Sequence, residues 1–104
     1  MSLSQFAPQE VSNSLYGLAV MDTAWTDLHV TAQAALASAL RRTSPQMTSQ
    51  EVANVMYSLA IITFDAHYQA LDDSSPAAQA LWSLHRTALE SFRRVPVSAY
   101  EVRA

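Results

Sequence analysis

Apolar residues recur every three or four positions along most of this chain, the spacing that places them on one face of an α-helix. One such series is Trp25, Leu28, Ala32, Ala35, Leu36 and Ala39. A second is Ala77, Leu81, Leu84, Ala88 and Phe92, flanked by a further apolar stripe made by Trp82 and Leu89. No segment shows the strict apolar–polar alternation expected of a half-buried strand. The pattern predicts an all-α fold.

Two segments of the chain repeat each other. Residues 9–19 read QEVSNSLYGLA and residues 50–60 read QEVANVMYSLA, so seven of the eleven positions are identical. Recurrence after about 40 residues is typical of proteins built from stacked helical hairpins. We therefore expect the two segments to be the first helices of two equivalent units.

The same start signal precedes each copy and occurs a third time near residue 97. An apolar residue just before the N-cap is followed by a valine in the first turn, as in a hydrophobic staple. The pairs are Phe6 with Val11, Met47 with Val52, and Val97 with Val102. Capping boxes are predicted for Thr48 with Glu51 and for Ser98 with Glu101. The first copy instead has Pro8 at the first helical position, where its missing N–H costs nothing.

The second helix of each unit has its own boundaries. In the first unit, Asp22 or Thr23 is the expected N-cap, and the helix ends near Arg41–Arg42. These cations suit a helix C-terminus, and Pro45 prevents continuation. In the second unit, the expected start is Ser75-Pro76 and the expected end is Arg93–Arg94, before Pro96. Residues 64–74 are extra in the second unit, and they either extend its first helix or form a short additional turn.

These boundaries predict a single helical-repeat domain over residues 1–104. Repeat 1 covers about 6–46, repeat 2 about 47–96, and a third repeat starts at 97–104 and is cut short. A single hairpin cannot bury its apolar face, but stacked hairpins share one core, so we expect a short α-solenoid of αα-hairpins. The same pattern also allows an ordinary four-helix bundle. Exposed repeat ends in a solenoid fragment favour homo-oligomers formed end to end.

The repeated string Q-E-V-[SA]-N-x-[LM]-Y-x-L-A resembles the octotricopeptide-type repeats, which are helical-hairpin repeats of organellar RNA-binding proteins. Related arrays occur in proteins with a RAP domain and in the FAST-kinase-like family. Those repeats usually have Trp where Tyr16 and Tyr57 stand here. The resemblance implies an α-solenoid that binds single-stranded RNA inside the cell, in a mitochondrion or plastid. Family arrays have many units, so the chain is expected to be a piece of a larger protein or a divergent short relative.

Composition narrows the function classes. The chain has 104 residues, of which six are Arg, none is Lys and none is Cys, and its formal net charge is −3. Absence of cysteine excludes disulfides, thiolate catalysis and cysteine-ligated zinc. The net acidity argues against a generic basic nucleic-acid binder. The apolar runs are far shorter than the roughly 20 residues that span a bilayer, so no membrane association is expected.

No group of residues supplies the parts of an enzyme active site. His29 follows Asp27 by two positions, and His67 follows Asp65 in the same way. On a helix, the Asp and the His of such a pair point to different sides and cannot share a site. His85 has no carboxylate at helical spacing. Asp72-Asp73 lacks the further ligands and the glycine of a calcium loop. We therefore expect no catalysis, no metal and no cofactor.

Four repeated polar or aromatic residues are candidates for contact with RNA or a protein partner. Asn13 and Asn54 either read a base edge or form a hydrogen bond between units. Because the two copies are identical, the structural role is favoured. Tyr16 and Tyr57 either stack on bases or pack across the interface between units, and packing is favoured.

Five arginines form the remaining candidate site: Arg41, Arg42, Arg86, Arg93 and Arg94. If the units stack in parallel, the arginines line up as a basic strip that contacts phosphates. The alternative, which is favoured, is that they only complement helix C-termini. The functional expectation is a non-enzymatic module that binds single-stranded RNA. The alternative is a protein–protein interaction scaffold or a self-associating helical domain.

Overall fold

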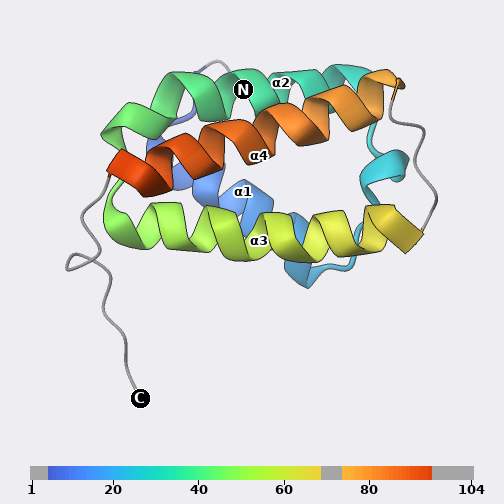
Figure 1. The fold of residues 1–104 in the computed structure, drawn as a ribbon, viewed down its shortest axis with the longest axis horizontal. Helices are drawn as coiled ribbons and strands as arrows, with labels where there is room; N and C mark the ends of the chain where they lie inside the picture. The colour runs from blue at the N-terminus through green and yellow to red at the C-terminus, as the bar shows by residue number, and fades with distance from the viewer. Residues whose placement is uncertain (1–4, 69–73, 95–104) are drawn as a thin grey trace.

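The computed structural model describes residues 5–68 and 74–94. Four α-helices follow one another: α1 (Pro8–Val20), α2 (Val30–Thr43), α3 (Ser49–Tyr68) and α4 (Pro76–Arg94). Two short 3-10 turns, η2 (Trp25–Asp27) and η3 (Ser44–Gln46), flank α2. The described part of the chain contains no strand, and the four helices pack into a compact globule (Figure 1). The all-α prediction is confirmed.

Helices of the same rank in the two predicted units lie side by side. α1 packs chiefly against α3, and α2 packs chiefly against α4, while α3 and α4 contact each other along the hairpin they form (Figure 1). α1 and α3 run in the same direction, because Ser12 meets Glu51 near their starts and Tyr16 meets Tyr57 one turn later. The molecule therefore has one layer made of α1 and α3 and a second made of α2 and α4.

Three helix starts lie where the sequence predicts them. α1 begins at Pro8, and the main-chain N–H of Ala7 donates to Glu10 Oε1 at 2.9 Å. At the start of α3, the Thr48 N–H donates to Glu51 Oε1 at 2.9 Å and the Glu51 N–H to Thr48 Oγ1 at 3.2 Å, which completes the capping box. Ser75 Oγ accepts from the Ala78 N–H at 3.1 Å and caps α4. The third predicted start, at 97–104, lies outside the described residues.

The predicted start of the second helix was wrong. Asp22 has a φ of 55°, in the left-handed region, and the chain then makes turn η2 instead of entering a helix. Leu28 is extended, and α2 begins only at Val30. Its N-cap is His29, whose ring Nδ1 accepts from the Thr31 N–H at 3.1 Å. An imidazole can cap a helix in this way, but histidine is not among the residues usually preferred there.

Helix ends are closer to expectation. α2 ends at Thr43, one residue beyond Arg42, and Pro45 lies in the turn that follows. α4 ends at Arg94, as predicted. The extra residues of the second unit extend its first helix at least to Tyr68, and residues 69–73 lie outside the described part.

One core joins both layers. Its largest buried side chains come from every α-helix and from η2, and they are Val11, Leu15, Trp25, Leu36, Leu40, Val55, Leu59, Ile62, Leu81 and Leu84. On α4, the predicted face is buried at Leu81, Leu84 and Ala88, whereas Phe92 is 38% exposed. The second stripe, Trp82 and Leu89, is also partly exposed. Gly17 lies in the middle of α1, and a Cβ added there would meet no atom within 4 Å.

Candidate functional site

A polar groove lies between the C-terminal half of α2 and the outer side of α4. Its volume is about 370 Å³. It is lined by Arg41, Ser44, Pro45, Ser83, Arg86, Thr87, Glu90 and Arg94. We call it the arginine groove, since three guanidinium groups and only one carboxylate line it. Its local charge is therefore opposite in sign to the net charge of −3 of the whole chain.

Hydroxyl groups hold two of these guanidinium groups in place. Arg41 Nη1 donates to Ser83 Oγ at 2.7 Å, which links the end of α2 to α4. Arg94 Nη2 donates to Ser91 Oγ at 3.1 Å and reaches Ser44 Oγ at 3.5 Å, which links α4 back to η3. Both arginines thus bridge the two predicted units. Because a neutral hydroxyl does not cancel the positive charge, each guanidinium stays available to an anion.

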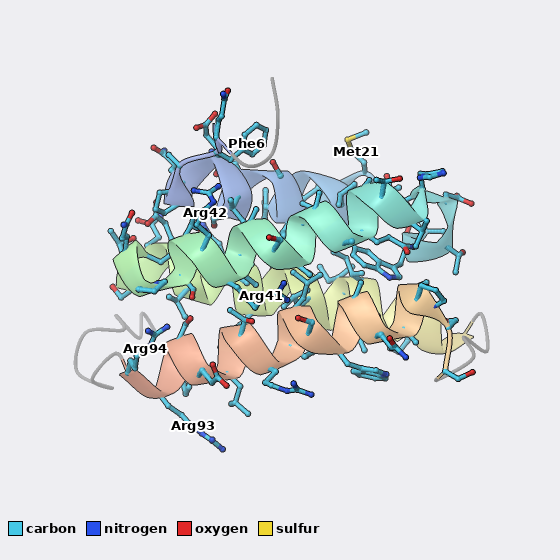
Figure 2. All side chains as sticks on the ribbon, turned by 90° about the horizontal axis from the view of Figure 1, so that it is seen from above. Phe6, Met21, Arg41, Arg42, Arg93 and Arg94 are labelled. Atoms are coloured by element: carbon cyan, nitrogen blue, oxygen red, sulfur yellow. The ribbon has the colours of Figure 1, made fainter. Side chains whose placement is uncertain are left out.

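The predicted strip of five arginines divides in the structure. Arg41, Arg86 and Arg94 line the arginine groove. Arg42 points toward α1 instead, and its Nη2 donates to the main-chain oxygen of Phe6 at 3.0 Å (Figure 2). Arg93 points away from the molecule (Figure 2). Neighbouring residues on a helix are separated by about 100°, so the members of each arginine pair cannot face the same way.

A helix-end role accounts for part of this arrangement. Arg41 lies in the last turn of α2, and Arg93 and Arg94 lie in the last turn of α4, where cations stabilise the helix dipole by about 0.3–1 kcal/mol each. Arg86 has no such role, since it lies in the middle of α4. The position of Arg86 in the groove is therefore the part that helix termini do not explain.

The tyrosines and asparagines lie on the other layer. The Tyr16 and Tyr57 rings are 6.4 Å apart and tilted by 34°, and their side chains are 46% and 58% exposed. Asn13 is exposed and Asn54 is half-buried. All four belong to α1 and α3, so the structure does not bring them into the arginine groove. Tyr16 and Tyr57 contact each other between α1 and α3.

The hydrogen bond between units involves a residue that the sequence analysis did not select. Ser12 is buried, and its hydroxyl donates to the main-chain oxygen of Glu51 at 3.2 Å. The structural role expected of Asn13 is thus performed by its neighbour.

Other residues of the site also escaped the sequence analysis. Ser44, Ser83 and Ser91 hold the guanidinium groups, but the two inter-unit contacts join residues 42 and 50 positions apart, and no local pattern marks them. Trp82 is different, because it precedes Arg86 by four residues and so shares its face of α4. Trp82 is 45% exposed and lies against His85, with ring centroids 5.7 Å apart. The spacing of four residues between Trp82 and Arg86 was enough to predict from the sequence that this aromatic ring lies next to this cation.

His85 contributes no positive charge to the site at neutral pH. It is half-buried between α4 and α3, and its Nε2 contacts the Thr63 hydroxyl. Burial lowers the pKa of His85 below the ordinary value of 6.5, because the charged imidazolium loses its hydration. The ring is therefore neutral in the folded protein, and it packs as an aromatic beside Trp82.

The described residues contain no group of three or more side chains placed to hold a metal ion. Among the described helices, none has the length and apolar character needed to cross a bilayer. No protein-family model matches the chain, and comparison with curated proteins and with solved structures found no match. What the chain does is therefore inferred from its own residues.

Proposed function

We propose that this chain is a non-enzymatic helical-repeat module that binds single-stranded RNA, with the arginine groove contacting the phosphate backbone. The observation that carries the proposal is the convergence of Arg41, Arg86 and Arg94 from two units in one groove. A guanidinium presents paired N–H donors that match two phosphate oxygens. The hydroxyls of Ser83 and Ser91 orient two of the three without neutralising them.

The arrangement of the helices supports a repeat architecture. In a simple up-and-down bundle, the first and third helices lie on a diagonal. Here α1 packs on α3 and α2 on α4, with like helices adjacent. Adjacent, parallel packing of equivalent helices is what stacked αα-hairpins require. It agrees with the octotricopeptide-like string in α1 and α3, which on this proposal marks an RNA-binding solenoid of the organellar type.

Trp82 gives the proposed site a surface for a base. It is exposed on α4 one turn before Arg86, which lines the arginine groove. An exposed aromatic beside phosphate-binding cations is the usual arrangement for single strands, and stacking of one base is worth about 1–3 kcal/mol. The pair Tyr16 and Tyr57 is a less favourable surface, because α1 and α3 carry no Lys or Arg at all.

A polarisation titration with a labelled, mixed-sequence single-stranded RNA at low salt tests the proposal. Binding should weaken as salt is added, with a slope of about −0.7 per phosphate contacted, or roughly −2 for three contacts. Arg41→Ala and Arg86→Ala should each reduce both the affinity and the slope. Arg93→Ala removes the same charge from a side chain outside the groove and is the matched control (Figure 2). Absence of salt-dependent binding, or equal losses in all three variants, would contradict the proposal.

A protein-interaction scaffold is the second candidate, and one observation favours it. Large apolar side chains are exposed on α3 and α4, and they are Tyr57, Phe64, Trp82, Leu89 and Phe92. Large exposed apolar side chains are more typical of a contact with protein than of a contact with nucleic acid. Pull-down from a lysate with and without ribonuclease treatment tests it. If ribonuclease releases every captured partner, the scaffold function is excluded.

A further inference from the structure

α4 borders two grooves. The arginine groove lies between α4 and α2, and a second groove, of about 500 Å³, lies between α4 and α3. Met56, Leu59 and Ala60 of α3 form one wall of the second groove, and Ala88 and Leu89 of α4 form the other. We call it the apolar groove. Its volume falls within the range of about 300–1,000 Å³ that is usual for sites which take up apolar groups.

The exposed stripe of α4 beside this groove alternates apolar and cationic side chains. Trp82, Arg86, Leu89 and Arg93 follow one another at intervals of four, three and four residues, so they lie along one side of the helix. All four are exposed, and Arg86 and Leu89 also line the apolar groove. The only carboxylate of α4, Glu90, lines the arginine groove instead. The α4 side of the apolar groove is therefore positively charged.

The α3 side of the groove is uncharged. Tyr57, Ala60 and Phe64 follow one another at intervals of three and four residues, and all three are exposed. Between residues 52 and 64 the sequence contains no charged residue. Glu51 precedes this stretch, and its Oε1 accepts from the Thr48 N–H in the cap of α3. The two sides of the groove thus differ in charge, one cationic and the other neutral.

This distribution of charge argues against a second copy of the chain as the occupant. Face-to-face pairing of two such surfaces would bring Arg86 and Arg93 of both chains into one interface. Neither exposed stripe carries a carboxylate to compensate these four cations, and like charges opposed across an interface are unfavourable. The matching surface is one that is apolar along its centre and acidic along one edge.

We propose that the apolar groove binds an amphipathic helix of another protein, with acidic residues along one flank of that helix. Apolar residues at positions i, i+3, i+4 and i+7 of the partner enter the groove, as in other complexes where a helix lies in an apolar groove. The acidic flank lies over α4, where carboxylates reach Arg86 and Arg93, and an uncharged flank lies over α3. From Trp82 to Arg93 the stripe spans about 16 Å, or roughly three helical turns.

The proposal rests on the second candidate function, the protein-interaction scaffold, and not on RNA binding. Leu89 and Trp82 supply apolar area to be buried, and the two arginines select the partner and its orientation, since charge complementarity contributes mainly to specificity. A guanidinium pairs with a carboxylate through two parallel hydrogen bonds, so exchange of the charges should be felt directly.

Two labelled, designed helical peptides of about 16 residues test the proposal by fluorescence polarisation. Both carry leucine at i, i+3, i+4 and i+7, and one has glutamate where the other has lysine along the same flank. The parent chain should bind the glutamate peptide about tenfold more tightly. The double variant Arg86→Glu with Arg93→Glu should reverse this preference. Leu89→Ser should weaken binding of both peptides, whereas Val30→Ser, at an exposed valine that begins α2, should leave both unchanged.

Circular dichroism shows whether each variant stays folded, so lost binding is not confused with unfolding. Binding of neither peptide by the parent, equal binding of both, or a preference that survives the charge reversal would overturn the proposal. So would a parent chain that dimerises in sedimentation equilibrium while Leu89→Ser does not, because the groove would then hold a second copy. If ribonuclease releases every partner in the pull-down, the scaffold function fails but the peptide result stands, so the two failures are distinguishable.

Discussion

Trp25 donates its indole Nε1–H to the main-chain oxygen of Ala77, 2.8 Å away. The ring is buried, and it joins the turn before α2 to the first turn of α4. Its own main-chain oxygen accepts from the Gln33 side-chain amide at 2.9 Å. One residue in a three-residue turn therefore links that turn to the nearby helix α2 and to α4, which is 52 residues away in the sequence.

Replacement of Trp25 by Phe should destabilise the protein by about 1–3 kcal/mol, from the lost hydrogen bond and the smaller ring. Urea unfolding followed by circular dichroism measures the loss. Trp82→Phe is the matched control, because Trp82 is half-exposed, and it should change stability by less than about 0.5 kcal/mol. Equal losses in both variants would show that the Trp25–Ala77 contact contributes nothing specific.

Thr48→Ala should cost about 1 kcal/mol, since it leaves the Glu51 N–H at the start of α3 without its cap. Thermal unfolding should show a midpoint lower by several degrees. Gln50→Ala, at an exposed position of the same first turn, is the control and should be close to neutral. A midpoint unchanged by Thr48→Ala would mean that the capping box does not stabilise the folded state.

Val52→Asp should unfold the protein, because it places an unpaired charge at a position that is 1% exposed. Loss of the helical signal at 25 °C, or a loss of stability above about 3 kcal/mol, is expected. Gln50→Asp adds the same charge at the exposed surface two residues earlier and should leave the protein folded. A Val52→Asp variant that melts like the parent would show that this face of α3 is not part of the core.

Stability should decrease in mildly acidic solution because of His85. Since burial lowers the pKa of His85 in the folded state, the unfolded chain takes up a proton first as pH falls below about 6.5. The contribution is complete above that value and is lost as pH falls toward the lower pKa of the folded state. Unfolding free energies at about pH 7.5 and pH 5.5 should differ less for His85→Gln than for the parent. The same pH dependence in both proteins would exclude His85 as its source.

Local signals in the sequence predicted the helix starts well. Pro8, Thr48 and Ser75 each mark a start through bonds within one turn, and such bonds depend only on nearby residues. The start of α2 was missed because Asp22 adopts a left-handed conformation, which delays the helix to Val30. Trp25, in the turn before α2, donates to Ala77 of α4, which lies 52 residues further along the chain. The pattern of residues near Asp22 gives no sign of this contact.

The candidate site was predictable in part. Five arginines were selected from the sequence, but which of them share a groove depends on the direction of each side chain on its helix. Arg41 and Arg42 are neighbours, yet one bonds to Ser83 on α4 and the other to Phe6 before α1. Both contacts join residues that are far apart in the sequence. Sequence spacing alone therefore could not show that Arg41 lines the groove and Arg42 does not. Trp82 was recognised as apolar, while its place beside Arg86 follows from helical spacing and was overlooked.

Gly17 has a consequence for how the protein would respond to engineering. Glycine in a helix interior is less favourable than alanine by about 1 kcal/mol. The space around it is open and its φ is negative, so a methyl group would meet no obstacle. Gly17→Ala should therefore raise the unfolding midpoint in a thermal scan, and a lower midpoint would show that the backbone there needs its freedom. The shortest of the four helices is therefore less stable than its backbone geometry allows, and one added methyl group would raise the free energy of unfolding of the protein.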